Sequence, residues 1–146
     1  GQNFGAKEYL RVKESYYRAI TYGTIIMIIA GSIIFFNAER IVSIFTNDVV
    51  VMNYGIIYLK ISALIFPAYP IYFISNGFFM ALKKASYAMN LNIIRNVLLP
   101  IPTIYFAKFI GGSYKNFFLS YCLFNWIFVS LLLIFVFIYI RKELHS

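Results

Sequence analysis

Four largely apolar runs, separated by short polar segments, organise the chain. They cover residues 20–36, 61–82, 90–110 and 117–140. A helix needs about 20 predominantly apolar residues to cross the hydrocarbon core of a bilayer, and these runs are close to that length. The pattern therefore predicts an all-α integral membrane fold in which residues 1–146 contribute four transmembrane helices.

The segment before the first run, residues 1–18, is polar and basic. Glu14 and Arg18 are four residues apart with the acid first, which is the favourable order for a pair on one helix face. This segment predicts an interfacial basic helix that runs directly into the first span. After that span, Thr46-Asn47-Asp48 supplies N-cap chemistry for a helix that starts near Val49.

Prolines and small residues predict how the spans bend and pack. Pro67 and Pro70 lie inside the second span, and Pro100 and Pro102 lie inside the third. Proline removes a backbone donor, so each pair predicts a kink or local unwinding that neighbouring helices must satisfy. Small residues in the first span allow helices to approach closely: Gly23, Ala30, Gly31 and Ser32. Between the third and fourth runs, Gly111-Gly112-Ser113 predicts a turn.

Composition supports a membrane environment. The chain is 62% hydrophobic and 12% charged, with a mean hydropathy of +0.77, whereas soluble domains carry about 25% charged residues. A soluble fold of this size could not bury so much apolar surface. The single cysteine, Cys122, lies inside an apolar run, so no disulfide within the chain is expected.

Basic residues flank the apolar runs and predict an orientation. The net charge is +8, but bases at the ends of apolar runs suit lipid headgroups and cytoplasmic loops, so no nucleic-acid partner is expected. If residues 1–18 are cytoplasmic, most bases share that side: Lys7, Arg11, Lys13, Arg18, Lys83, Lys84, Arg141 and Lys142. The other side holds only Arg40, Lys108 and Lys115. This bias predicts a multi-pass protein of the cytoplasmic (plasma) membrane with both ends of this segment cytoplasmic.

The spans contain no groups suited to acid–base or metal chemistry. No Asp or Glu lies within a predicted span, and the only histidine, His145, is next to the last residue. General acid–base catalysis needs a titratable group held in a site, so an enzyme is not expected. The sequence also predicts no cofactor and no metal site. Any carboxylate that couples transport to protons or sodium would lie outside this segment.

Arg95 is the most informative polar residue. It lies about two turns inside the third span, where a charge is costly unless it faces protein or water. Asn92, Asn96, Leu99 and Thr103 continue its face at helical spacing, which predicts an inward polar stripe. Two interpretations stay open: Arg95 lines a substrate path or gate, or it snorkels to the cytoplasmic headgroups.

Two buried-looking amides carry the same ambiguity. Asn76 lies deep in the second span beside Gly77, and Asn125 lies beside Trp126 in the fourth. They are candidates for a substrate path or gate, but amides also act as hydrogen-bonding glue between helices. Lys60, at the start of the second span, is expected to snorkel toward the outer surface.

Short motifs follow one another along most of the chain. They are Gln2-x-x-Gly5-Ala6, Phe45-Thr46-Asn47-Asp48, Tyr58-Leu59-Lys60-Ile61, the run 77–85 and the proline-containing run 92–102. Their order and spacing resemble the C-terminal part of multidrug and toxic compound extrusion (MATE) transporters. Met80 and Lys83 depart from one bacterial subgroup, which usually has Gln and Gly at these positions.

The resemblance implies a two-lobed, twelve-helix antiporter that exports organic cations or drugs in exchange for protons or sodium. This chain would supply the last four helices, and the remaining helices with the N-terminal lobe would be its partners, together with membrane lipid. The Gln2, Gly5 and Ala6 loop is implied as a structural element. The four prolines are candidate bending points for alternating access.

Other classes of protein were weighed against this one. A lipid-linked oligosaccharide flippase of the same superfamily shares the two-lobed plan, but such proteins usually line a large cavity with many charges, whereas this segment offers essentially Arg95. A free-standing four-helix membrane subunit is another alternative. The chain begins without Met and inside a polar segment, which favours a piece of a longer protein. A membrane enzyme ranks last, because catalytic groups are lacking.

Overall fold

The computed structural model describes residues 2–143, which are almost entirely helical and contain no strand. Residues 144–146, including His145, lie outside the described range. The elements in chain order are α1 (Gln2–Gly5), α2 (Tyr9–Ser43), α3 (Val49–Ile65), α4 (Ala68–Ala81), α5 (Ala85–Ile93), the π-helical segment η1 (Ile94–Leu98), α6 (Pro100–Phe109) and α7 (Tyr114–Glu143).

Two helices are long and apolar enough to cross a membrane unbroken. These are α2 and α7, which contain the first and fourth predicted spans and extend beyond both ends of each. The pair α3 and α4 is bent by 48° and counts as a third span if taken together. The third predicted span, residues 90–110, is divided among α5, η1 and α6, each much shorter than a bilayer crossing. The predicted count of four transmembrane helices is therefore not confirmed by the described residues, which give two, or three if the bent pair is one span.

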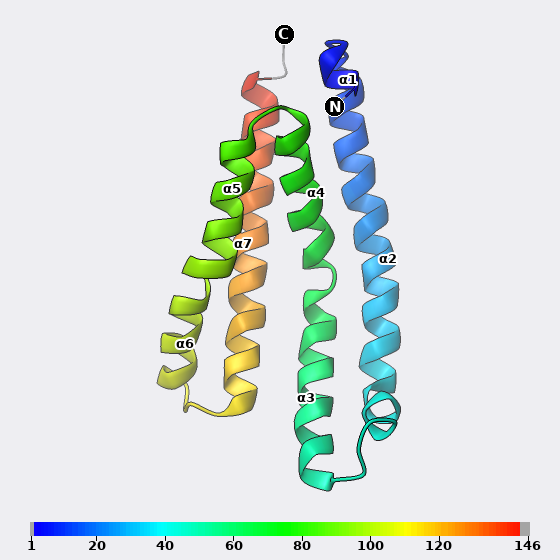
Figure 1. Cartoon of the computed structure of the whole chain (residues 1–146), viewed down its shortest axis with the longest axis vertical. Coiled ribbons are helices and arrows are strands. Elements are labelled where there is room, and N and C mark those ends of the chain that lie inside the picture. Colours follow the sequence, from blue (N-terminus) through cyan, green and yellow to red (C-terminus); the bar gives the residue numbers. More distant parts are fainter. Residues whose placement is uncertain (1, 144–146) are drawn as a thin grey trace.

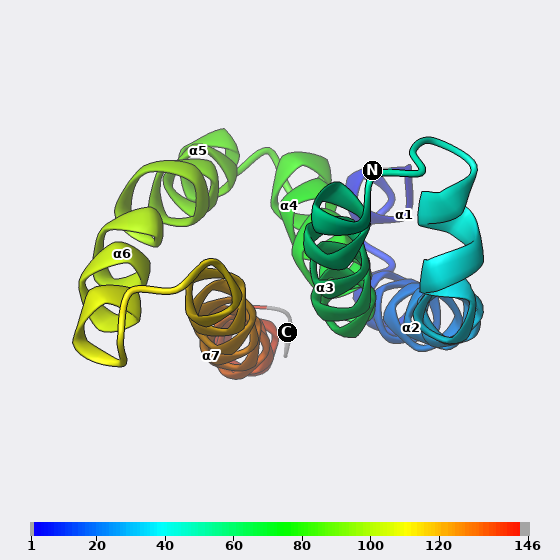
Figure 2. The ribbon, with the colours of Figure 1, turned by 90° about the horizontal axis from the view of Figure 1, so that it is seen from below.

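The helices run up and down along one long axis (Figure 1). Helix α2 descends from the N-terminal end, α3 and α4 return beside it, α5 to α6 descend again, and α7 returns. Viewed from below, α2 and α6 lie at opposite edges, with α3, α4 and α7 between them (Figure 2). Helix α1, the α4–α5 connection and the C-terminal end of α7 therefore share one end of the molecule.

The break between α3 and α4 occurs at Pro67, which has no N–H to continue the ladder. The N–H of Phe66 instead bonds the Ala63 carbonyl at 3.3 Å. The indole Nε1 of Trp126, on α7, donates to the Leu64 carbonyl at 3.1 Å. A neighbouring helix thus satisfies a carbonyl at the break, as a membrane-embedded interruption requires.

Glycines on α2 allow the broken helix to approach closely. A Cβ placed on Gly31 would lie 2.7 Å from the Ala63 carbonyl oxygen, and one on Gly23 would lie 3.0 Å from the Pro70 Cβ. Only a residue without a side chain fits such distances between packed helices. The predicted role of small residues in the first span is confirmed at these two positions.

The second break, between α5 and α6, is a π-turn followed by a new helix start. The N–H of Leu99 reaches the Ile94 carbonyl at 2.8 Å, which is the wide π spacing. Pro100 is the first residue of α6 and Pro102 the third, so both lie in a first turn where no N–H is needed. The sequence predicted kinks at the prolines; at both pairs one helix ends and another begins.

Helix ends follow the residues that the sequence offers. Asp48 caps α3, accepting from the N–H groups of Val50 and Val51 at 2.8 and 3.2 Å, as predicted. The predicted turn after α6 is also present, with Gly111 at φ +116° and Gly112 at φ +65°. These left-handed values are natural for glycine, which has no Cβ.

Lysine adopts the same left-handed conformation at two other helix ends. Lys7 has φ 60° after α1 and Lys83 has φ 59° after α4. In both turns the next residue's N–H bonds the carbonyl five residues back, at 2.8 and 2.9 Å respectively. This is the Schellman pattern that usually places glycine at the left-handed position. The Gln-x-x-Gly-Ala loop is thus a single helical turn, α1, closed by Lys7.

Candidate functional site

Arg95 lies in a pocket of aromatic rings contributed by the start of α4. Its guanidinium carbon is 4.0 Å from the ring centroid of Tyr72, 5.0 Å from that of Tyr69 and 5.6 Å from that of Phe73. Arg95 is only 8% exposed, although Phe73, one of the three rings around it, is itself exposed. Its guanidinium therefore packs against α4, which favours the inward-facing interpretation over snorkelling.

Arg95 is the second residue of the π-helical segment η1. Here the buried positions of this segment follow one stripe toward α4 and α7: Ala88, Leu91, Arg95, Leu99 and Thr103. Asn92 and Asn96 are exposed beside that stripe. The predicted inward stripe is thus correct for Arg95, Leu99 and Thr103, while the two asparagines are exposed beside it; Asn96 directly follows Arg95 and so cannot share its helix face.

Asn92 still belongs to the same cluster through Tyr72. The Tyr72 hydroxyl donates a short hydrogen bond to Asn92 Oδ1, and Asn92 Nδ2 donates to the Ala88 carbonyl at 2.8 Å. This arrangement fixes the Tyr72 ring over Arg95 from the side of α5. The structure therefore brings Asn92, Arg95 and Tyr72 together at the junction of α4, α5 and η1.

The other predicted amides are not joined to this cluster by any hydrogen bond. Asn76 lies one turn beyond Tyr72 on α4 and is half-buried. Asn125 is fully buried on α7, where Nδ2 donates to the Tyr121 carbonyl at 2.9 Å. Its Oδ1 has no partner within the described residues. A buried amide oxygen without a donor is costly, so Asn125 is a place where an additional donor would be stabilising.

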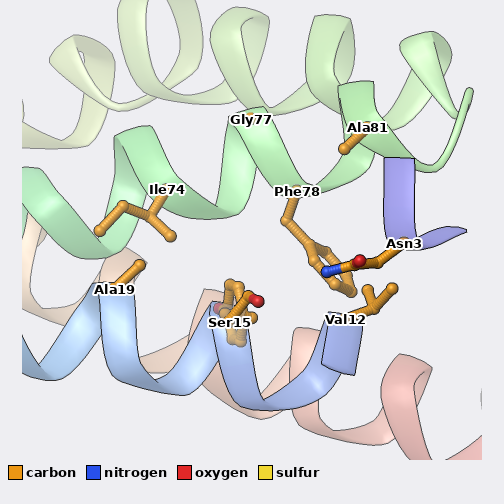
Figure 3. A pocket seen from close by; sticks show the side chains of 9 residues that line it. Asn3, Val12, Ser15, Ala19, Ile74, Gly77, Phe78 and Ala81 are labelled. Atoms are coloured by element: carbon orange, nitrogen blue, oxygen red, sulfur yellow. The ribbon is translucent and has the colours of Figure 1, made fainter. Parts of the chain in front are cut away.

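A separate cavity of about 260 Å³ lies between α1, α2 and α4, near the N-terminal end (Figure 3). Asn3 and Ser15 bring polar atoms to it, while Ile74, Phe78 and Ala81 supply apolar walls. Beside it, the Tyr16 hydroxyl and Ser75 share a buried hydrogen bond of 2.8 Å that ties α2 to α4. Gln2, Gly5 and Ala6 are exposed and do not line this cavity.

Sequence reasoning missed the aromatic residues that surround Arg95. The signal was present in the run 69–73, where aromatic side chains recur at spacings of three and four and so share one helix face. The sequence does not show which residue these rings pack against, because Arg95 and Tyr72 are far apart along the chain and meet only when α5 folds back on α4. Within residues 2–143 no group of His, Cys, Asp and Glu side chains is arranged to hold a metal ion.

Comparison with known proteins places the chain in a family. No curated protein and no solved structure matches it. The family model MatE matches residues 1–106, which run from the N-terminus through α5 and η1 into α6 and include the Arg95 cluster. Members of this family are membrane transporters, in keeping with the long apolar helices α2 and α7. Because the match covers well over half of its length, the chain belongs to the MatE family of membrane transporters.

Proposed function

We propose that the chain is the C-terminal part of a two-lobed, twelve-helix antiporter that exports organic cations or drugs in exchange for protons or sodium. The MatE match over residues 1–106 is the observation that carries this proposal. In it, four segments cross the bilayer: α2, the bent pair α3–α4, the broken segment α5–η1–α6, and α7. They alternate in direction along one axis, as a multi-pass protein requires (Figure 1).

The proposed orientation puts both ends of the segment in the cytoplasm. Lys83 and Lys84 lie at the same end of the molecule as α1 and as Arg141 and Lys142. That clustering supports a cytoplasmic assignment, because positive residues are enriched in short cytoplasmic loops. Cysteine labelling offers a check: a cysteine at Lys84 is expected to react only with a membrane-permeant reagent in intact cells, and one at Lys115 with an impermeant reagent as well.

The coupling ion is proposed to bind outside this segment. All five acids of the chain are exposed near helix ends or in loops: Glu8, Glu14, Glu39, Asp48 and Glu143. Proton and sodium coupling in membrane transporters usually needs a carboxylate inside the membrane. The segment would therefore contribute packing, bending at its two proline breaks and the Arg95 cluster, and the remaining helices would contribute the coupling carboxylates.

The direct test is dye efflux from cells that lack their own major exporters. The full-length transporter is expected to drive ethidium out of preloaded cells. Efflux should stop when the gradient of the coupling ion is collapsed, and separate collapse of the proton and the sodium gradients shows which ion that is. Arg95→Ala at matched expression should lower efflux, whereas Lys108→Ala, an exposed base at the end of α6, should not. Efflux that is no greater than in cells with empty vector would refute the export of this class of cation.

A further inference from the structure

The Arg95 guanidinium has a charge that no side chain within residues 2–143 neutralises. No hydrogen bond or ion pair reaches it within residues 2–143, where the one ion pair is the exposed Arg18–Glu14 contact at 3.5 Å. The surrounding rings engage the face of the guanidinium, and a guanidinium has five N–H donors in its plane. Those donors have no acceptor within residues 2–143, and none of the guanidinium nitrogens is among the fully enclosed atoms, so a group on a neighbouring helix can reach them.

Aromatic contacts alone do not offset the cost of burying this charge. A cation–π contact is weaker than the penalty for removing an ion from water, even after the protein relaxes around the ion. A buried charge is therefore normally paired and hydrogen-bonded. Since the acids of this chain are exposed at helix ends and in loops, the acceptor has to come from elsewhere.

We propose that Arg95 forms a buried ion pair with a carboxylate on a transmembrane helix outside this chain, packed against η1 and the start of α4. This inference rests on the proposed function, in which the chain is one part of a larger transporter. The exposed side chains of Asn92 and Asn96 flank Arg95 and give that helix a polar surface to pack on. Amide side chains at such depth are suited to contacts between helices and poorly suited to lipid.

A resident carboxylate fits the site better than a carboxylate on transported cargo. The guanidinium is charged at every stage of transport, so an acceptor that leaves with the cargo would leave the charge unpaired for part of each cycle. A resident pair is also electrically neutral as a whole. It would therefore remove the repulsion that a lone Arg95 exerts on a cationic compound moving nearby.

The sign of a stability change tests this pair in the full-length transporter. If Arg95 is paired, Arg95→Met removes one partner and strands a buried carboxylate, so the melting temperature should fall by about 5 °C or more. Arg95→Lys, which keeps the charge, should lose less. If Arg95 has no partner, Arg95→Met removes an uncompensated charge, and an unchanged or higher melting temperature would overturn the proposal.

The partner is then found by a second substitution. In the Arg95→Met background, each intramembrane Asp or Glu of the other helices is changed to Asn or Gln, and one of these changes should restore the melting temperature. Restoration by none of them would also overturn the proposal. Lys60→Met is the matched control, because Lys60 also lies over a ring, that of Phe35 at 5.7 Å, but is exposed, and it should melt as the wild type does. Melting does not depend on export, so dye efflux judges the proposed function separately.

Discussion

The two halves of the chain have the same arrangement of helices but differ in how closely those helices pack. Each is a hairpin of one long continuous helix and one proline-broken helix: α2 with α3–α4, and α7 with α5–η1–α6. The first hairpin is closely packed at its centre, with Gly31 against the Ala63 carbonyl and Gly23 against Pro70, and its cavity of about 260 Å³ lies toward the N-terminal end. The second opens at α5, where a cavity of about 400 Å³, lined mostly by apolar side chains, separates α5 from α7.

Glycine accounts for the difference in closeness. Helices α2, α3 and α4 all contain glycines, whereas α5, η1, α6 and α7 contain none. Where both surfaces carry full side chains, the backbones stay farther apart and bulky rings such as Tyr87 and Phe135 fill only part of the space. A proline break does not by itself determine how closely two helices pack. In the first hairpin the facing glycines allow close packing, whereas in the second the facing side chains leave a cavity beside the segment that carries Arg95, which is unpaired within residues 2–143.

The largest expected effect comes from opening the first hairpin at Gly31. A methyl group added there would meet a backbone oxygen at 2.7 Å, so α2 and α3 would have to separate. We expect Gly31→Ala to lower the free energy of unfolding by about 2 kcal/mol, in the range of overpacking substitutions, despite the better helix propensity of alanine. Unfolding of the purified protein in a graded detergent series measures this change.

Gly77→Ala is the matched control for that substitution. Gly77 lies on α4 of the same hairpin, but nothing lies within 4 Å of the position where its Cβ would be. Alanine there should be neutral or slightly stabilising, because only the helix propensity changes. If the two variants were equally stable, the close approach at Gly31 would not be what holds the first hairpin closed.

Much of the first hairpin could be predicted from sequence, because its determinants are local. The Asp48 cap, the small residues of α2 and the break near Pro67 all act through chain neighbours or through a generic packing rule. The Arg95 cluster is different, since it needs α4 and η1 to meet, and these are separated along the chain. Helical spacing predicted Arg95, Leu99 and Thr103 to face inward, but Asn96 is adjacent to Arg95 and lies on another face of the helix.

A smaller effect is expected where the two hairpins join. Trp126 on α7 donates to the Leu64 carbonyl beside the first break, at 3.1 Å. Trp126→Phe keeps an aromatic ring and removes the donor, so we expect a loss of about 1 to 2 kcal/mol in the free energy of unfolding. Ile127→Phe places the same phenyl ring at the exposed neighbouring position, where no hydrogen bond to the Leu64 carbonyl is lost, and should be close to neutral. Equal stability of the Trp126 variant and the wild type would mean that the break is sealed without α7.

The smallest effect, and the only gain, is expected at the helix ends. Lys83 ends α4 in a left-handed conformation at φ 59°, and Gly111 ends α6 in the same kind of turn. A residue with a Cβ is strained there by about 1 to 2 kcal/mol, part of which glycine returns through its greater freedom in the unfolded chain. Lys83→Gly should therefore raise the free energy of unfolding by about 0.5 to 1 kcal/mol.

The reverse substitution completes the comparison of these two turns. Gly111→Ala imposes on α6 the strain that Lys83 imposes on α4, so it should cost about 1 kcal/mol in the same unfolding measurement. Lys84→Gly serves as the control, because Lys84 has an ordinary φ of −102° and gains nothing from glycine. A stabilising effect at Lys84 as large as that at Lys83 would indicate relief of charge repulsion between the two lysines, not of backbone strain. Stabilisation at Lys83 alone would mean that a lysine stands where the backbone favours glycine.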